Sequence, residues 1–183
     1  MGTRILKTPR LVLRPFTVED APAMYANWAG DPQVTRWLRW PPHESVTATR
    51  AVLEEWAASY AQPDFYNWAI TLQDGTLIGS IGVMRAEAGD HLEPGYALGR
   101  AWWGQGYATE ALRAVVEYLF SQEGVQALSC CHAVENPASG AVQRKVGFRY
   151  GHDDVYHKLD GTPVACKCYL LTKKEFYDGT RND

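Results

Sequence analysis

Residues 100–112 read Arg-Ala-Trp-Trp-Gly-Gln-Gly-Tyr-Ala-Thr-Glu-Ala-Leu, and this stretch decides the fold. A short apolar run, residues 95–99, precedes it and is typical of a strand. After it, apolar residues recur at helical spacing from Ala108 to Phe120, with Glu110, Arg113 and Glu117 on the opposite face. The pattern predicts a strand that runs through a two-glycine turn directly into an amphipathic helix.

The turn has the composition of an anion-binding loop. The first N–H groups of a helix have no carbonyl partner, and the aligned peptide dipoles make that end partly positive. Gly104 and Gly106 lack the Cβ atoms that would keep an anion away from the backbone. The spacing predicts a phosphate or pyrophosphate cradle, with an ordinary tight turn as the alternative.

Length and composition favour one globular domain over residues 1–183. Of the 183 residues 46% are hydrophobic, and no apolar run approaches the length of a membrane span. The net charge of -3 argues against a general nucleic-acid or membrane-surface binder and suits a cationic partner such as an amine. No secretory signal pattern opens the chain, so we expect a cytoplasmic protein.

The four cysteines, Cys130, Cys131, Cys166 and Cys168, fit a metal site poorly. If both segments are strands, Cys166 and Cys168 share one face, whereas the adjacent Cys130 and Cys131 point to opposite faces. Four sulfurs then cannot converge on one ion. We expect no metal, and reduced, buried thiols that pack as small hydrophobic groups.

The first half of the chain predicts a strand, two helices and a hairpin. A strand with Leu11 and Leu13 leads to a capping box that begins at Thr17, and Ser45 opens the second helix after an irregular segment at residues 33–42. From Tyr66 the apolar period becomes two, and an Asp-Gly turn at residues 74–75 leads to a return strand over residues 77–84.

The second half predicts strands that alternate with helices. A strand over residues 127–133 follows the long helix and should run parallel to the strand before the glycine turn. Asn136 caps a further helix, and two strands, residues 148–159 and 164–171, precede a frayed tail after Tyr177. The order β-α-α-β-β-β-α-β-α-β-β describes an α+β fold, with one mixed sheet and helices on both faces.

Two segments of the chain resemble signatures of one family. Residues 103–111, Trp-Gly-Gln-Gly-Tyr-Ala-Thr-Glu-Ala, resemble the acyl-CoA loop of the GNAT (GCN5-related) N-acetyltransferases, in the ribosomal-protein N-terminal acetyltransferase branch (RimJ/RimL-like). Asn-Pro-Ala-Ser at 136–139 and Lys-Val-Gly-Phe at 145–148 match its other signature, and residues 8–16 are similar to the opening strand of that branch. The resemblance spans nearly the whole chain. It implies the GNAT acyl-CoA N-acyltransferase fold and direct transfer of an acetyl group from acetyl-CoA to a primary amine, on a protein N-terminus or a small molecule.

The resemblance also implies where acetyl-CoA would bind. Amides of the loop would hold the pyrophosphate, and the strand before it would pair with the pantetheine arm and offer an N–H to the oxyanion. Asn136 would contact the pantetheine as well as cap its helix, and Lys145 is either a phosphate contact or a solvated lysine. The loop and strand residues so implied are Gly104, Gln105, Gly106, Ala108, Thr109, Ala97, Leu98 and Gly99.

Two side chains are implied in catalysis. A primary amine has a pKa of about 8 (α-amine) to about 10 (lysine), so at neutral pH it needs a base or a water chain. Glu93, at the head of the central strand, matches a glutamate that faces the amine in the family; Glu135 is its rival, and the nearby His132 reads as structural. Ser139 would lie beside the CoA sulfur and donate to the departing thiolate.

Aromatic residues are the candidates for the acceptor wall, because aromatic faces attract cations. Residues 33–45 and 85–92 would select the acceptor, while the acyl length and a homodimeric state stay open. The loop does not match a dinucleotide-binding motif, because it lacks a third glycine at the required spacing. The remaining alternative is a non-catalytic acyl-CoA-binding domain on the same fold. The predicted wall residues are Trp37, Trp40, Tyr66 and Trp68.

Overall fold

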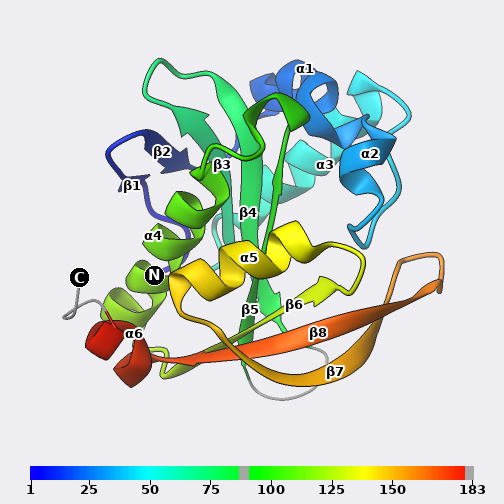
Figure 1. The fold of residues 1–183 in the computed structure, drawn as a ribbon. Coiled ribbons are helices and arrows are strands. Elements are labelled where there is room, and N and C mark those ends of the chain that lie inside the picture. Colours follow the sequence, from blue (N-terminus) through cyan, green and yellow to red (C-terminus); the bar gives the residue numbers. More distant parts are fainter. Residues whose placement is uncertain (87–90, 180–183) are drawn as a thin grey trace.

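The strands of the protein form one eight-stranded sheet (Figure 1) in a computed structural model that describes residues 1–86 and 91–179. The order is β1-β2-β3-β4-β5-β6-β8-β7, and all neighbours are antiparallel except the central pair β5 and β6. The predicted mixed sheet with one parallel pair is therefore confirmed. The strands are β1 (Leu6–Lys7), β2 (Leu11–Arg14), β3 (Tyr66–Leu72), β4 (Leu77–Arg85), β5 (Leu92–Leu98), β6 (Ala127–Ala133), β7 (Arg149–His157) and β8 (Pro163–Thr172).

Helices cover both faces of the sheet, as predicted (Figure 1). One face carries the helices between residues 18 and 59, over a cluster that includes Trp28 and Leu53, and the other carries those between residues 107 and 179, over a larger cluster. Within the described residues no helix is long and apolar enough to cross a bilayer. The helices are η1 (Val18–Asp20), α1 (Ala21–Met24), η2 (Tyr25–Ala29), α2 (Pro32–Thr35), α3 (Val46–Ser59), η3 (Arg100–Trp102), α4 (Tyr107–Gln122), α5 (Pro137–Val146) and α6 (Lys173–Gly179).

The predicted helix starts are confirmed by their capping contacts. The Asp20 carboxylate accepts from the N–H of Thr17 at 2.9 Å, and the Ser45 hydroxyl accepts from the N–H of Ala48 at 3.1 Å. These contacts satisfy donors that a helix leaves without carbonyl partners.

Two helices and a strand escaped the sequence analysis. The segment at residues 33–42 is not wholly irregular, because Asp31 accepts from the N–H of Gln33 and starts α2. Helix α6 begins before the tail expected after Tyr177 and continues into it as far as Gly179; Glu175 accepts from the N–H and hydroxyl of Thr172 at its start. The missed strand, β1, comprises two residues. The final part of that tail, residues 180–183, and part of the predicted acceptor-selecting loop, residues 87–90, lie outside the described residues.

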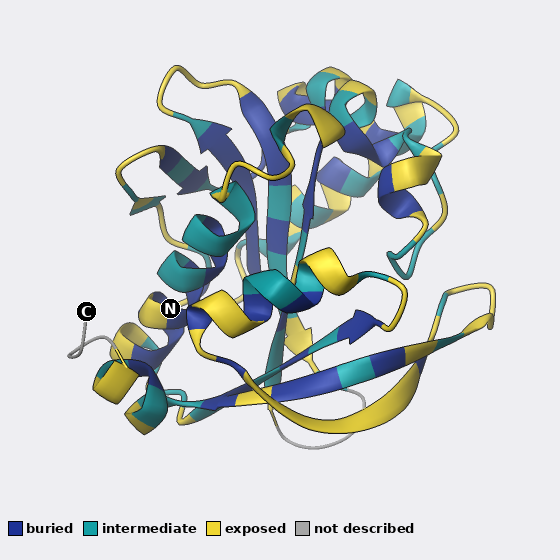
Figure 2. Ribbon diagram, viewed as in Figure 1, coloured by how far each residue is buried: buried dark blue, intermediate teal, exposed yellow. Residues whose placement is uncertain are grey.

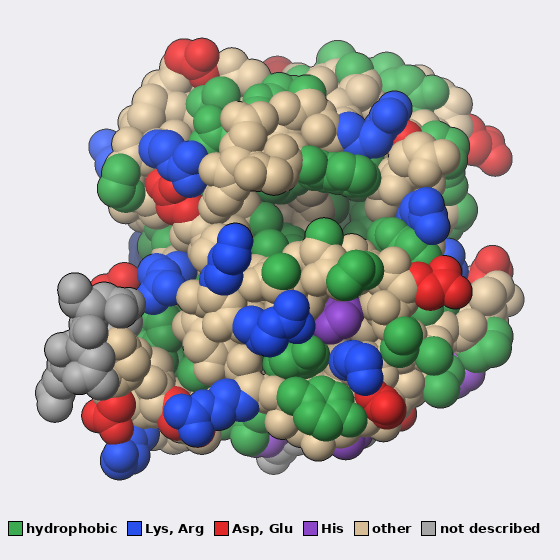
Figure 3. Space-filling view, viewed as in Figure 1, with side chains coloured by type: hydrophobic (Ala, Val, Ile, Leu, Met, Phe, Trp, Pro, Cys, Tyr) green, Lys and Arg blue, Asp and Glu red, His purple; other side chains and the backbone are tan. Residues whose placement is uncertain are grey.

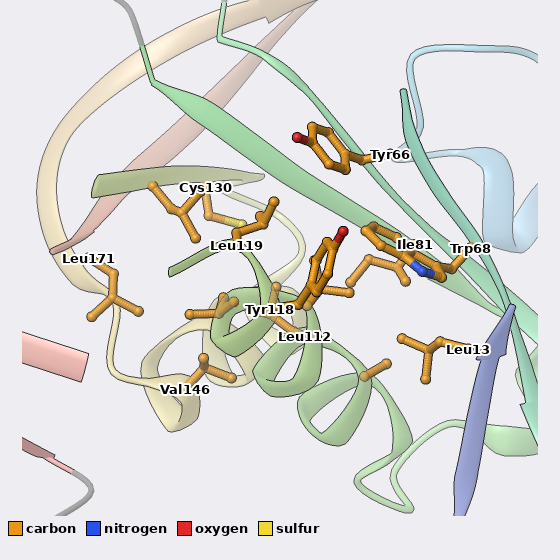
Figure 4. Packing of buried hydrophobic residues seen from close by; sticks show 14 of the residues in the cluster. Leu13, Tyr66, Trp68, Ile81, Leu112, Tyr118, Leu119, Cys130, Val146 and Leu171 are labelled. Carbon is orange, nitrogen blue, oxygen red and sulfur yellow. The ribbon is translucent and has the colours of Figure 1, made fainter. Parts of the chain in front are cut away.

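The larger cluster lies between the sheet and α4. Figure 2 shows the central strands buried and β7 exposed along nearly its whole length. Figure 4 shows residues of α4 pointing at the sheet, where the ring of Tyr118 meets that of Trp68 edge to face, with centroids 6.0 Å apart. β3 is buried on both faces because helices cover both, so it alternates less clearly than a half-exposed strand.

The cysteine prediction was wrong in part. β6 and β8 pair Cys131 directly with Cys168 on one face of the sheet, and these two form a disulfide. Cys130 and Cys166 are buried free thiols. Cys130 does point away, its thiol donating to the carbonyl of Pro94, but the sulfurs of Cys131, Cys166 and Cys168 lie within 4.8 Å of one another. The cross-strand register, which the sequence does not show, brings them together.

Candidate active site

The two central strands, β5 and β6, separate after a single paired position. β5 and β6 pair only at Leu92 and Leu128, although both strands continue for several residues. A cavity of about 740 Å³ is lined by both strands beyond that pair. Figure 3 shows the surface hollowed between the loop that follows β5 and helix α5. A gap in a ladder leaves strand-edge N–H and C=O groups available to a third, extended partner.

Alternation along β5 decides which backbone groups face the gap. In an antiparallel ladder the N–H and C=O of one residue point to the same side, and those of the next residue point away. The N–H of Gly99 donates to Ile78 of β4 at 2.9 Å, so the backbone groups of Leu98 point toward the gap. The carbonyl of Leu98 there accepts from the indole N–H of Trp103 at 2.7 Å. Of the three predicted strand residues, Leu98 therefore directs its N–H into the cavity.

The glycine loop has the backbone that only glycine adopts readily. Gly104 and Gly106 have φ angles of 72° and 83°, and Gly106 caps α4. The first helical hydrogen bond runs from the N–H of Glu110 to the carbonyl of Gly106, so the preceding N–H groups point outward. Four of the five predicted loop residues, Gly104, Gly106, Ala108 and Thr109, line the cavity; Gln105 does not.

An ion pair between Arg10 and Glu110 supports the glycine loop. The guanidinium of Arg10 donates to the carboxylate of Glu110 at 2.6 Å and to the carbonyl of Gln105 at 2.9 Å. The hydroxyl of Thr8 donates to the same carboxylate at 2.6 Å. Burial alone would raise the pKa of Glu110, but these hydrogen bonds and the nearby guanidinium lower it below its usual value. The carboxylate is therefore charged at neutral pH, and through Arg10 it ties helix α4 to the loop.

Helix α5 brings Ser139 to the cavity. Asn136 caps the helix and its side chain accepts from the N–H of Ser139 at 3.4 Å; both residues, and Lys145, line the cavity. The hydroxyl of Tyr96 lies 2.9 Å from that of Ser139 and donates to its carbonyl at 3.0 Å. Sequence reasoning missed Tyr96, although its alternation with Ala97 along β5 signalled that it faces the α5 side of the sheet.

Polar atoms without partners line the same region. Within the described chain, His132 Nε2 and Gln143 Oε1 are buried and have no hydrogen-bond partner. The Gln143 amide donates to the carbonyl of Cys131 at 3.2 Å, at the edge of β6. Such atoms are costly to leave unsatisfied. His132 Nε2 lies against Gly140 of α5, whereas the Gln143 carbonyl oxygen suits an amide N–H of an extended ligand arm in the gap. The residues present thus suit acetyl-CoA.

Glu93 lies on the other face of β5. Alternation places Glu93 and Ala97 opposite Tyr96 and Leu98, and Glu93 lines the cavity. The two predicted catalytic residues, Glu93 and Ser139, therefore approach the gap from opposite faces of the sheet. The rival Glu135 is exposed and does not line the cavity.

The predicted aromatic wall is partly present. Trp37 and Trp40 line the cavity, and so do Trp56, Phe65 and Tyr156, which the sequence analysis did not single out. Trp68 does not reach the cavity, because it is a fully buried core residue whose indole N–H donates to Arg4. Tyr66 touches the cavity, but its ring stacks on Trp68 and its hydroxyl donates to Glu123.

The β7–β8 turn holds the wall in place. The hydroxyl of Tyr156 donates to the carbonyl of Trp37 at 2.9 Å, and Lys158 donates to that of Arg36 at 2.7 Å. The N–H of Leu159 donates to Arg39 at 2.8 Å. Partners more than a hundred residues apart in the chain therefore hold this end of the cavity lining together.

The gap between β5 and β6, beside a glycine loop at a helix N-terminus, suits the extended arm and the pyrophosphate of an acyl-CoA, as in an acyl-CoA-dependent acyltransferase. Residues 10–149 match the family described as Acetyltransferase (GNAT) domain. The chain belongs to the GNAT acetyltransferases, a family that uses acetyl-CoA, and it is an N-acetyltransferase that acts on an amine acceptor.

The relatives span nearly the whole chain. It is 34% identical over 173 residues to the "Uncharacterized N-acetyltransferase YoaA" of Bacillus subtilis (strain 168), covering 92% of this chain and 97% of that one. It is 27% identical over 174 residues to the "Uncharacterized N-acetyltransferase p20" of Bacillus licheniformis, covering 93% and 97%. The fold matches Mycobacterium smegmatis RimJ in complex with CoA-disulfide with a TM-score of 0.80 at 23% identity, covering 94% of this chain and 87% of that one.

Proposed function

We propose that the protein transfers an acetyl group from acetyl-CoA to a primary amine, on a protein N-terminus or a small molecule, with no role for a metal. The observation that carries this proposal is the gap between β5 and β6, with Ser139 on one face and Glu93 on the other. Acetyl-CoA supplies an activated acetyl thioester.

The cosubstrate would be held by backbone groups. Gly104, Gly106, Ala108 and Thr109 offer N–H groups at the positive end of α4 to the pyrophosphate, with Lys145 as a further phosphate contact. Asn136 and the edge of β5 offer polar groups to the pantetheine amides. The N–H of Leu98 is the donor for the carbonyl oxygen that gains negative charge, and one such donor contributes a few kcal/mol of barrier lowering.

Glu93 is the proposed proton acceptor, directly or through water. An ammonium has no lone pair and must lose one proton before its nitrogen attacks. As the N–C bond forms and the C–S bond breaks, a second proton leaves the nitrogen and one proton ends on the sulfur. Ser139, in the first turn of α5, donates a hydrogen bond to that sulfur, where the helix dipole also favours negative charge.

The pH–rate profile tests this assignment. With acetyl-CoA and a panel of peptides and small amines, released thiol should appear, and kcat/KM should rise with pH to a plateau. Glu93→Gln removes the proton acceptor at equal size, so the rate at neutral pH should fall about ten- to a hundredfold and recover partly at high pH, where solvent deprotonates the amine.

Glu135→Gln is the matched control, since it removes a neighbouring carboxylate that does not line the cavity. An unaltered profile in Glu93→Gln would contradict the role of Glu93. Tight acetyl-CoA binding without turnover of any amine would instead favour the alternative, a non-catalytic acyl-CoA-binding domain.

A further inference from the structure

A tyrosine joins the two sides of the cofactor gap. Tyr96 comes from the strand β5, and Ser139 comes from the helix α5, which follows β6 in the chain. The phenol oxygen lies 2.9 Å from the Ser139 hydroxyl and 3.0 Å from the Ser139 carbonyl. Both residues line the cavity. The contact therefore lies within the proposed cofactor site, on the face of the sheet where Ser139 stands.

The phenol is a donor at every working pH. Burial raises the pKa of Tyr96 far above its usual range, so the group keeps its proton. Its single O–H has the carbonyl and the hydroxyl of Ser139 within reach, and the side chain of Gln143 is a further hydrogen-bond neighbour. When the O–H points to the carbonyl, the phenol oxygen can accept from the Ser139 hydroxyl; when it points to the hydroxyl, the hydrogen of Ser139 is free to point elsewhere.

Ser139 needs such a partner to act as a directed donor. A serine hydroxyl near a helix start rotates freely and can turn back to nearby backbone groups. The Asn136 side chain already holds the backbone N–H of Ser139, but it leaves the hydroxyl unconstrained. Tyr96 is the group that fixes the hydroxyl oxygen. An O–H donated to that oxygen also strengthens the hydrogen bond that Ser139 itself donates, because linked hydrogen bonds polarise one another.

We propose that Tyr96 is a positioning residue for Ser139: its hydroxyl holds the serine oxygen and aims the serine O–H at the sulfur of bound CoA. This inference rests on the proposed function. Tyr96 transfers no proton and acts only through Ser139. Tyr96→Phe and Ser139→Ala should therefore remove the same interaction, and the double variant should be no worse than Ser139→Ala alone.

The thiol of bound CoA gives a readout that needs no acceptor. A donor aimed at the sulfur stabilises the thiolate, so the pKa of the thiol, followed by ultraviolet absorbance of the complex, should be lower on the wild-type protein than in free CoA. Tyr96→Phe should raise that pKa toward the value of free CoA, by about one pH unit. Ser139→Ala should raise it as much, and the double variant should raise it no further.

Turnover gives the second readout. Tyr96→Phe should lower kcat about tenfold, with KM for acetyl-CoA changed less than about twofold, as for an interaction made mainly in the transition state. The matched control is Tyr118→Phe, which removes a buried hydroxyl bonded to Gly2 and Glu123, away from the cavity. It costs stability in the same manner but should leave both readouts at the wild-type values.

Three outcomes would overturn the inference. A Tyr96→Phe variant with wild-type thiol pKa and kcat would leave the tyrosine without a role at the sulfur. If the losses in kcat caused by the two substitutions multiply in the double variant, Tyr96 contacts the sulfur itself, independently of Ser139. CoA that fails to bind the wild-type protein would overturn this inference together with the proposed function, whereas bound CoA without turnover would contradict only the latter.

Discussion

Gly106 shows how much one residue decides in the loop. Its φ of 83° is a conformation that side chains with a Cβ rarely adopt, and a Cβ there would stand 3.3 Å from Arg10 Nη2. Gly106→Val should therefore displace the loop from Arg10 and fill the proposed pyrophosphate site. We expect acetyl-CoA affinity to fall at least a hundredfold, measured by calorimetry.

Gly161 provides the control for that substitution. It has the same φ of 83° in the turn between β7 and β8, with open space around its Cβ position. Gly161→Val thus introduces similar backbone strain far from the loop and should leave acetyl-CoA affinity unchanged. Equal affinity in both variants would show that the pyrophosphate binds elsewhere.

At the scale of elements, the contact between α5 and β6 sets the position of Ser139. A Cβ at Gly140 would come 2.4 Å from Nε2 of the buried His132, so only glycine permits this approach. Gly140→Ala should push α5 away from β6. We expect the free energy of unfolding to fall by about 1–3 kcal/mol in urea titrations, and kcat to fall with it.

Gly179→Ala is the comparison at the end of α6, where nothing lies within 4 Å of the Cβ position. It should not lower stability, since alanine is the better helix former. A Gly140→Ala variant as stable and active as the wild type would mean that His132 moves aside without cost.

Local signals predicted most of the elements, and long-range contacts explain what they missed. Thr17, Ser45 and Asn136 carry caps that are legible within four residues of sequence. The same reasoning, applied to Thr172 and Glu175, would have found α6.

The site was harder to predict than the fold. The spacing of the glycines pointed to the loop, and the resemblance to a known family singled out Ser139. The wall instead depends on contacts such as Tyr156 to Trp37, whose partners are 119 residues apart. Trp37 and Trp68 look alike in the sequence; only the packing shows that one lines a cavity and the other fills the core. The disulfide depends likewise on the register of β6 and β8.

For the whole molecule, the disulfide between Cys131 and Cys168 links two strands 37 residues apart in the chain. Closing such a loop restricts the unfolded chain, so loss of the bond should cost about 2–4 kcal/mol. We expect reductant to lower the Tm of the wild type but not that of Cys168→Ser, measured by calorimetry.

Thiol counting supplies the check. In denaturant without reductant, the wild type should show two reactive thiols, those of Cys130 and Cys166. Cys166→Ser should keep the response of Tm to reductant, because it removes a free thiol on the same strand. Four reactive thiols in the oxidised protein would contradict the disulfide.

Because β5 and β6 share a single ladder pair, the sheet consists of two half-sheets, β1 to β5 and β6 to β7, with few backbone hydrogen bonds between them. Their opening angle is set by side-chain packing rather than by backbone hydrogen bonds, and amide hydrogen exchange should record this as an alternating pattern along one strand. The amide of Gly99, bonded to Ile78, should exchange slowly, whereas that of Leu98 should exchange fast. Bound acetyl-CoA should slow the exchange of the Leu98 amide and leave that of Gly99 unchanged. Equal exchange rates at both positions without ligand would show that backbone hydrogen bonds join β5 and β6 at this end as well.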